Sequence, residues 1–360
     1  MKSIIVTTDH RYSFNTRSNN LSKDLQIYSD IFKLIPFTWI VDRTGSANLP
    51  FHTHLIGQHK LDPEIEPTKS FDEICQETVE KYKNITGQIY ILWSGGIDST
   101  LLLVSFLKSN IDKNKIVVAC NFDSIKEYHS FYKNHILPNF QIISVDRFIA
   151  DSNYDSINGV VLTGDPCDVL FGNDLALDVA KNLGFDYLKK PCSRENVVNY
   201  LEKKNFDIES ANCWYDYFMH SVPKSPKEIK TMQDYSWWEG FNHRWQAANE
   251  KIKIRFSTEN SKKCIQFFDT NQFQSWAINN NQMPLKSFND LKLESKKIIF
   301  EFTKDQHYYD NKIKLHSNSY VFGLNSHSVT LDDDQRLTAN EFNIFDFYNQ
   351  NNFINDWISC

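Results

Sequence analysis

The segment Ile91 to Thr100, which reads ILWSGGIDST, places two glycines between a short apolar run and an Asp-Ser-Thr sequence. Glycines let backbone N–H groups approach an anion closely, and a helix that follows them adds the positive end of its dipole. We therefore expect this turn to bind phosphate groups, through Ser94, Gly95, Gly96, Ser99 and Thr100. Asp98 stands where either a helix cap or a ligand of a phosphate-bridging metal ion is favoured.

A second segment whose residues could take part in binding or catalysis runs from Gly159 to Asn173 and reads GVVLTGDPCDVLFGN. An apolar strand ends in a Thr-Gly turn, and Asp165 and Asp168 follow at a spacing of three residues. Mg²⁺ needs hard oxygen ligands from the protein as well as from phosphate. Asp98 and Asp168 are therefore the candidate metal ligands.

The first segment resembles the SGGxDS signature of the PP-loop ATP pyrophosphatases, which cleave ATP between its α and β phosphates and activate a substrate as its adenylate. The second resembles the pattern SGxGxDELFGGY of the asparagine synthetase C-terminal domain. Thr163 and Gly164 match its Ser-Gly, Asp165 matches the following acid, and Asp168 matches the Asp of its Asp-Glu pair. The chain departs from this pattern at Pro166, Cys167, Val169 and Asn173.

The resemblance implies ATP and Mg²⁺ as cofactors, with Gly164 at the nucleotide and Asp165 as the general base that takes a proton from an incoming amine. It also implies a lysine that neutralises charge as pyrophosphate leaves. The stretch Lys312-Ile313-Lys314 falls where the family has Arg-Pro-Lys, so Lys314 is the candidate. Lys296 and Lys297 are the alternatives.

The elements that must position these residues alternate between strand and helix. Apolar runs predict strands over Gln88–Trp93, Ile116–Cys120, Gln141–Val145 and Val160–Thr163, with helices over Ser99–Lys108 and Ile125–Asn134 between them. This order predicts an α/β fold with a doubly wound parallel sheet and the ligand at the carboxyl ends of its strands. The resemblance implies a sheet of the adenine nucleotide α-hydrolase-like (PP-loop/HUP) type.

Helical patterns surround this sheet in the sequence. We expect helices over Phe71–Tyr82 before it, and over Leu175–Leu183 and Ser193–Lys203 after it. The dense aromatic residues from Cys213 to Trp245 predict the core of a helical cap, with an acceptor pocket as the alternative. The apolar IIFEF run, residues 298–302, reads as a strand.

We divide the chain into three parts. Residues 1–70 form a small β-containing N-terminal segment, and residues 316–360 form a C-terminal extension. Residues 71–315 form the asparagine synthetase-like ATP-binding domain, with the nucleotide sheet at about 85–190 and a helical cap or acceptor region at about 190–290.

Composition narrows the classes of partner. The chain has 360 residues, 41% hydrophobic and 23% charged, and a net charge of -6, so it has no strong basic excess and we expect no nucleic-acid partner. No apolar stretch is long enough for a membrane span, and the N-terminus has no hydrophobic signal core, so we expect a cytoplasmic protein. The seven cysteines are scattered without a CxxC pair, which favours reduced, non-ligating thiols.

The function that these features favour is an ATP-dependent, AMP-forming carbon–nitrogen ligase. It would adenylate a small-molecule or peptide carboxylate and transfer the acyl group to ammonia or an amine. Lys2 stands where glutamine-dependent asparagine synthetases carry their catalytic cysteine, so we expect free ammonia, a substrate amine or a separate glutaminase as the nitrogen source. Assembly into a homo-oligomer is an alternative to a separate glutaminase partner.

Three alternatives remain at this point. One is an intramolecular cyclase of the β-lactam synthetase or lasso-peptide cyclase kind. Another is a tRNA-modifying PP-loop enzyme, and the third is a nucleotide-binding protein that has lost catalysis.

Overall fold

A computed structural model describes residues 43–44, 46, 69–245, 256–280, 285–312, 328–331 and 337–340. Most of the proposed N-terminal segment and Lys314 lie outside these residues. Of the proposed C-terminal extension, only β6 (Ser328–Leu331) and β7 (Leu337–Asn340) are described, and they pair antiparallel.

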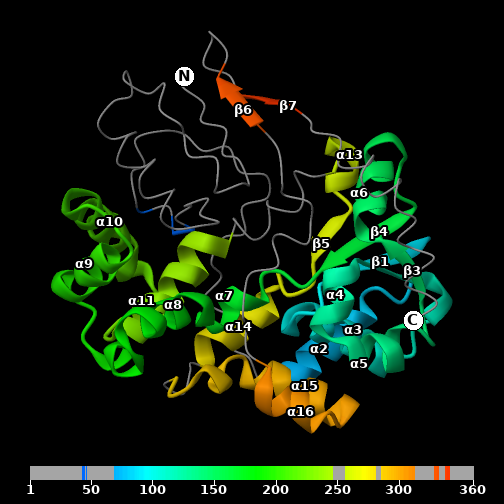
Figure 1. Cartoon of the computed structure of the whole chain (residues 1–360), viewed down its shortest axis with the longest axis horizontal. Helices are drawn as coiled ribbons and strands as arrows, with labels where there is room; N and C mark the ends of the chain where they lie inside the picture. Colours follow the sequence, from blue (N-terminus) through cyan, green and yellow to red (C-terminus); the bar gives the residue numbers. More distant parts are fainter. Residues whose placement is uncertain are drawn as a thin grey trace.

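A five-stranded parallel sheet forms the centre of the fold (Figure 1). Its strand order is β3-β2-β1-β4-β5. The strands are β1 (Gln88–Leu92), β2 (Ile116–Cys120), β3 (Gln141–Ser144), β4 (Gly159–Thr163) and β5 (Cys264–Gln266). The α/β class and the parallel sheet expected from the sequence are confirmed. The fifth strand was not predicted, because three residues are too few to show a strand period.

Apolar side chains cover both faces of the sheet. Successive residues of a strand point to opposite faces, so Ile91 and Leu92 belong to different core clusters. Ile91 packs in the cluster that contains α2 (Phe71–Glu80) and α3 (Ile97–Lys108), while Leu92 packs in the cluster that contains Val145 of α6 (Val145–Tyr154). Figure 1 shows α6 on one side of the sheet and α2 and α3 on the other. The sheet is therefore covered by helices on both sides, as a doubly wound arrangement requires.

The remaining helices follow the sheet strands or form the cap. Between β2 and β3 lie α4 (Phe122–Glu127), α5 (His129–Phe131) and the π-helix η2 (Tyr132–Ile136). After β4 come α7 (Cys167–Phe171), α8 (Asn173–Leu183), α9 (Arg194–Lys203), α10 (Ile208–Ser221), α11 (Met232–Trp238) and the π-helix η5 (Glu239–Arg244). The C-terminal group is α13 (Thr258–Ser261), α14 (Asn271–Asn279), α15 (Leu293–Thr303) and α16 (Gln306–Asn311).

Two local predictions were wrong. The IIFEF run lies inside α15, where Ile298 and Ile299 are buried and Glu301 is exposed. A short apolar run does not distinguish a strand from a helix that packs on one side. The helix expected over Ile125–Asn134 is interrupted at Tyr128, whose backbone (φ -145°, ψ 68°) ends α4.

Aromatic residues of the cap serve mainly as core. Trp214, Trp237, Trp238, Phe241 and Trp245 are each at most 1% exposed. The prediction that most of these aromatic residues serve as core is thus confirmed. Among the helices described, none combines the length and the apolar character that a membrane crossing requires.

Candidate functional site

The glycine turn lies between β1 and the start of α3. Gly95 has a φ of +75°, and a Cβ built on it would lie 2.4 Å from the carbonyl oxygen of Ser124. Both the backbone conformation and the lack of space therefore require glycine. Gly96 is the N-cap of α3, with an extended backbone (φ -73°, ψ 166°). The turn thus delivers the chain into a helix whose first backbone N–H groups face the carboxyl edge of the sheet.

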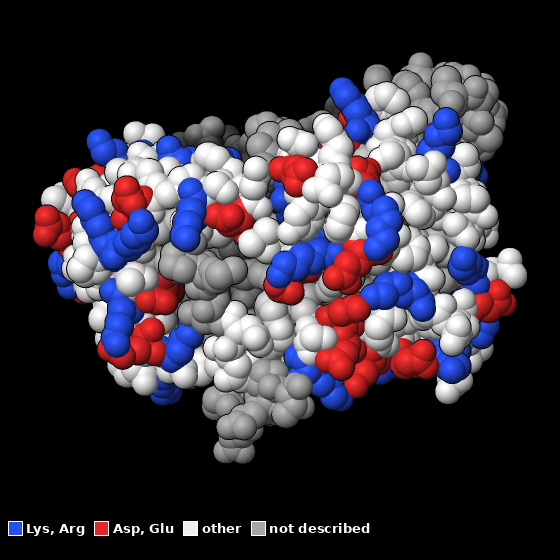
Figure 2. Space-filling view, turned by 90° about the horizontal axis from the view of Figure 1, so that it is seen from below, with Lys and Arg blue, Asp and Glu red and all other residues white. Residues whose placement is uncertain are grey.

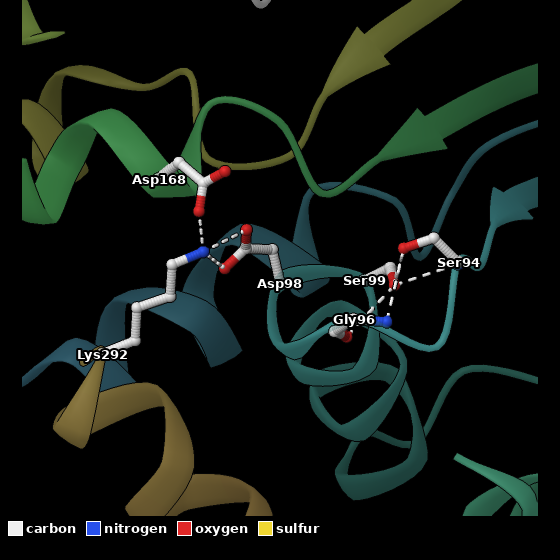
Figure 3. A network of polar contacts seen from close by, with 6 residues as sticks. All are labelled: Ser94, Gly96, Asp98, Ser99, Asp168 and Lys292. Atoms are coloured by element: carbon white, nitrogen blue, oxygen red, sulfur yellow. Dashed lines mark hydrogen bonds and ion pairs between the residues drawn. The ribbon is translucent and has the colours of Figure 1, made fainter. Parts of the chain in front are cut away.

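Two serine hydroxyls bridge this turn (Figure 3). Ser99 Oγ accepts a hydrogen bond from Ser94 N at 3.1 Å and lies 3.0 Å from Ser94 Oγ. Ser94 Oγ in turn accepts from the backbone N–H of Gly96 at 3.4 Å. The two hydroxyls and the turn backbone are thus gathered in one small region, as a phosphate-binding turn requires.

Thr100, the last residue predicted to contact phosphate, lies beneath the turn. Its side chain is fully buried, and its Oγ1 accepts a hydrogen bond from Trp93 Nε1 at 3.1 Å. This bond ties the end of β1 to the first turn of α3. Thr100 is therefore placed to support the turn from the core side.

The two motif segments meet directly. A Cβ built on Gly164 would lie 2.8 Å from Ser99 N and 2.9 Å from the carbonyl carbon of Asp98. Since β4 pairs with β1 over Gln88–Ile91, the turns that follow these strands are neighbours. The chain leaves β1 toward β2 on one side, while β4 lies on the other. The two turns therefore flank the point where the strand order reverses, which is where open α/β sheets bind ligands.

Asp98 and Asp168 converge on a single lysine (Figure 3). Lys292 Nζ lies 2.7 Å from Oδ1 and 2.6 Å from Oδ2 of Asp98, and it also forms an ion pair with Asp168 Oδ1. The Lys292 side chain is 4% exposed, against 20% for Asp98 and 23% for Asp168. The three side chains form a charge cluster in which the lysine is buried and the two carboxylates are partly exposed.

Lys292 reaches the site because α15 packs against α3. It is the residue before α15, and its backbone is in the left-handed region at φ 49° and ψ 42°. A residue other than glycine adopts this conformation at a cost of order 1 kcal/mol, and such conformations are concentrated at functional sites. The position of its ammonium between the two carboxylates therefore singles out Lys292, whose left-handed backbone is one of three among the described non-glycine residues.

Sequence reasoning missed Lys292 and favoured other lysines. Lys296 is buried but donates to the carbonyl oxygen of Asn289 at 3.1 Å, and Lys297 is exposed and pairs with Glu294 at 2.6 Å. Neither reaches the carboxylates, and Lys314 lies outside the described residues. Lys292 stands in the stretch KSFNDLKLESKK, where no local pattern separates it from its neighbours. Only the contact of α15 with α3 does so.

A second acid–lysine pair lies beside the glycine turn. Lys312 forms an ion pair with Glu127, and their side chains are 11% and 26% exposed. The Glu127 side chain packs closely against Gly95, because a Cβ on that glycine would lie 2.6 Å from Glu127 Cβ. Two lysines, Lys292 and Lys312, thus lie near the turn, and each forms an ion pair with a carboxylate.

Of the departures from the pattern that the sequence resembles, two lie in α7 (Cys167 and Val169), one begins α8 (Asn173), and Pro166 lies in the turn between β4 and α7. Asp165 is partly buried there, one residue after Gly164. Cys167 is fully buried, and burial together with the nearby Asp98 raises the pKa of its thiol well above the usual value. A thiol in this environment is a poor nucleophile, so Cys167 contributes to core packing.

The carboxylates fit a divalent cation only in part. Among the described residues, no group of three or more His, Cys, Asp or Glu side chains could hold a metal ion by itself. Asp98 and Asp168 nevertheless converge on one point, since both contact the same ammonium nitrogen. A cation at that point would receive oxygen ligands from both residues, and phosphate and water would have to complete its shell.

The surface below the sheet and α15 carries both signs of charge. In the view of Figure 2, Lys and Arg side chains are interspersed with Asp and Glu, so this face carries no continuous basic patch. Comparison of the chain with protein-family models, with curated proteins and with solved structures found no match.

Proposed function

We propose that this protein is an ATP-dependent, AMP-forming amide ligase with the glycine turn as its triphosphate site. One observation carries the proposal: two carboxylates from separate motifs converge on one cation position beside a glycine turn at the switch point of a parallel sheet. A phosphate-binding turn next to paired hard oxygen ligands suits a nucleoside triphosphate with Mg²⁺.

Each residue then has a defined task. Ser94, Gly95, Gly96 and Ser99 hold phosphate oxygens with backbone N–H groups and hydroxyls, and Asp98 and Asp168 hold Mg²⁺. When bound, the ion neutralises phosphate charge and favours departure of pyrophosphate.

Lys292 takes the task that the sequence suggested for Lys314. Its ammonium lies beside Asp98, in the first turn of the helix that follows the phosphate-binding turn, so it can donate to phosphate oxygens on which negative charge develops.

The reaction has two steps. A substrate carboxylate oxygen attacks the α-phosphorus, the bond between that phosphorus and the bridging oxygen breaks, and pyrophosphate leaves with the electron pair. An amine nitrogen then attacks the acyl carbon and displaces AMP, while Asp165 accepts the amine proton. Gly164 keeps the turn that carries Asp165 in contact with the phosphate-binding turn.

The test is ATP–pyrophosphate exchange measured across a panel of carboxylic acids. An acid that the enzyme adenylates supports exchange without any amine, and Asp98→Ala should reduce that exchange by about 10²-fold or more because the metal and Lys292 both lose their partner. Asp72→Ala is the control, since Asp72 pairs with Lys108 on the outer side of α2 and α3. Full exchange by the Asp98→Ala protein would refute the mechanism.

A second candidate is a nucleotide-binding protein without ligase activity. The observation in its favour is the same cluster, because a buried lysine that neutralises two carboxylates is also what a permanently closed site contains. Binding of ATP with no exchange for any acid in the panel would support this candidate.

A further inference from the structure

The Lys292 ammonium stands where a divalent cation would bind. It contacts both oxygens of Asp98 and one oxygen of Asp168, which are the protein ligands available at this point. We infer that Lys292 is an internal cation that closes the site to free divalent metal, so that metal enters only together with a nucleotide. This inference rests on the proposed nucleotide site.

Charge and space support exclusion of free metal. Mg²⁺ requires oxygen ligands at about 2.0–2.1 Å in a near-octahedral shell. The two carboxylate oxygens of Asp98 lie 2.7 and 2.6 Å from the Lys292 ammonium, which already occupies the position that the metal would take. A metal ion that joined them would face Lys292 at very short range, and the low exposure of the Lys292 side chain would weaken solvent screening of that repulsion.

A nucleotide changes this balance. Its triphosphate, held by the turn from Ser94 to Ser99, would bring negative charge next to Asp98, since Asp98 directly precedes Ser99. Lysine carries its charge on a flexible four-carbon stem, so the Lys292 ammonium can shift from carboxylate to phosphate with little backbone movement. The carboxylates are then released to the metal, which also gains phosphate ligands.

This arrangement couples two ligands of one site. In the free protein, only the molecules in which Lys292 has left the carboxylates can bind metal. The apparent metal affinity is therefore the intrinsic affinity multiplied by the fraction of such molecules. Metal and nucleotide therefore each raise the affinity for the other, by the same factor.

The experiment measures Mn²⁺ binding to the full chain by water proton relaxation, with and without α,β-methylene-ATP. The wild-type protein should bind Mn²⁺ weakly alone and form an enhanced ternary complex with the nucleotide analogue. Lys292→Met should bind Mn²⁺ without nucleotide about 10- to 100-fold more tightly than wild type, the range of ordinary coupling between ligands. Lys296→Met is the matched control, because Lys296 is equally buried on α15 but bonds to a backbone carbonyl.

Two results would overturn the inference. One is wild-type protein that binds Mn²⁺ alone as tightly as Lys292→Met; the other is folded Lys292→Met that shows no gain. Lys292→Gln, which keeps a hydrogen-bonding group in the pocket, replaces Lys292→Met if that variant does not fold. Mn²⁺ binding is measured independently of ATP–pyrophosphate exchange. Exclusion of free metal by Lys292 can therefore be refuted while exchange is observed, and it can be supported while no exchange is observed.

Discussion

Gly164→Ala probes the contact between the two motif turns. The added methyl group would lie 2.8 Å from Ser99 N, whereas ordinary van der Waals contact begins at 3.4 Å. The two turns must therefore separate by about 0.6 Å, and the three nearest atoms all belong to the backbone, which cannot rotate away. Overpacking of this kind typically costs about 1–3 kcal/mol, and the reduced freedom of the unfolded chain returns about 0.4–1 kcal/mol.

We expect a net loss of about 1–2 kcal/mol in the free energy of unfolding, measured by urea denaturation. The same displacement moves Asp98 relative to Asp168, so exchange activity should fall by about 10-fold or more. Gly240→Ala is the control, since a Cβ there would lie 3.8 Å from Val169 Cγ1, an ordinary contact. Wild-type stability and activity in the Gly164→Ala protein would refute the close packing of the turns.

Two further predictions concern buried polar groups. Thr100→Val leaves the buried indole N–H of Trp93 without its acceptor and should lower the free energy of unfolding by about 1–3 kcal/mol. Thr100→Ser keeps the hydroxyl and should retain most of the wild-type stability. Equal urea midpoints for wild type and Thr100→Val would contradict this prediction. Lys227 lies 3.2 Å from the centre of the Trp237 ring without a hydrogen bond in the described part of the chain, and burial lowers its pKa from 10.5 to about 6. Between these two values the unfolded chain carries a proton that the folded chain lacks, so wild-type stability should rise with pH, by up to about 1.4 kcal/mol per pH unit. Lys227→Met should be more stable than wild type at pH 7 and lose this slope, and identical urea unfolding profiles from pH 6 to pH 10 would show that the lysine is charged in the folded state.

Local sequence signals predicted much of the sheet. The β2 strand was expected at Ile116–Cys120 and is found there, because the β-branched residues of this apolar run favour a strand over a buried helix. The expected helix start at Ser99 lies two residues inside α3, which begins at Ile97. Strand β5 was missed because three residues are too few to show a strand period, and helix α15 was missed because the apolar run inside it was interpreted as a strand.

The glycine turn and the two carboxylates were identified from sequence for a similar reason. Local geometry requires two of the glycines, through a left-handed backbone at Gly95 and a turn after β4 that passes close to α3 at Gly164, and Asp98 and Asp168 follow these glycines within a few residues. Such requirements act over a few neighbouring residues, so they appear as short patterns in the chain.

The cation of the site was decided only by the tertiary structure. Lys292 is separated from Asp98 by 194 positions, and it approaches the carboxylates because α15 packs on α3 and its own backbone is left-handed. Nothing in the stretch around it distinguishes Lys292 from Lys296 or Lys297. By itself, the sequence predicted four of the five strands, because apolar runs and turn glycines reflect local requirements, and it identified Asp98 and Asp168 as candidate ligands. The partner charge depends on long-range packing, which no short pattern records.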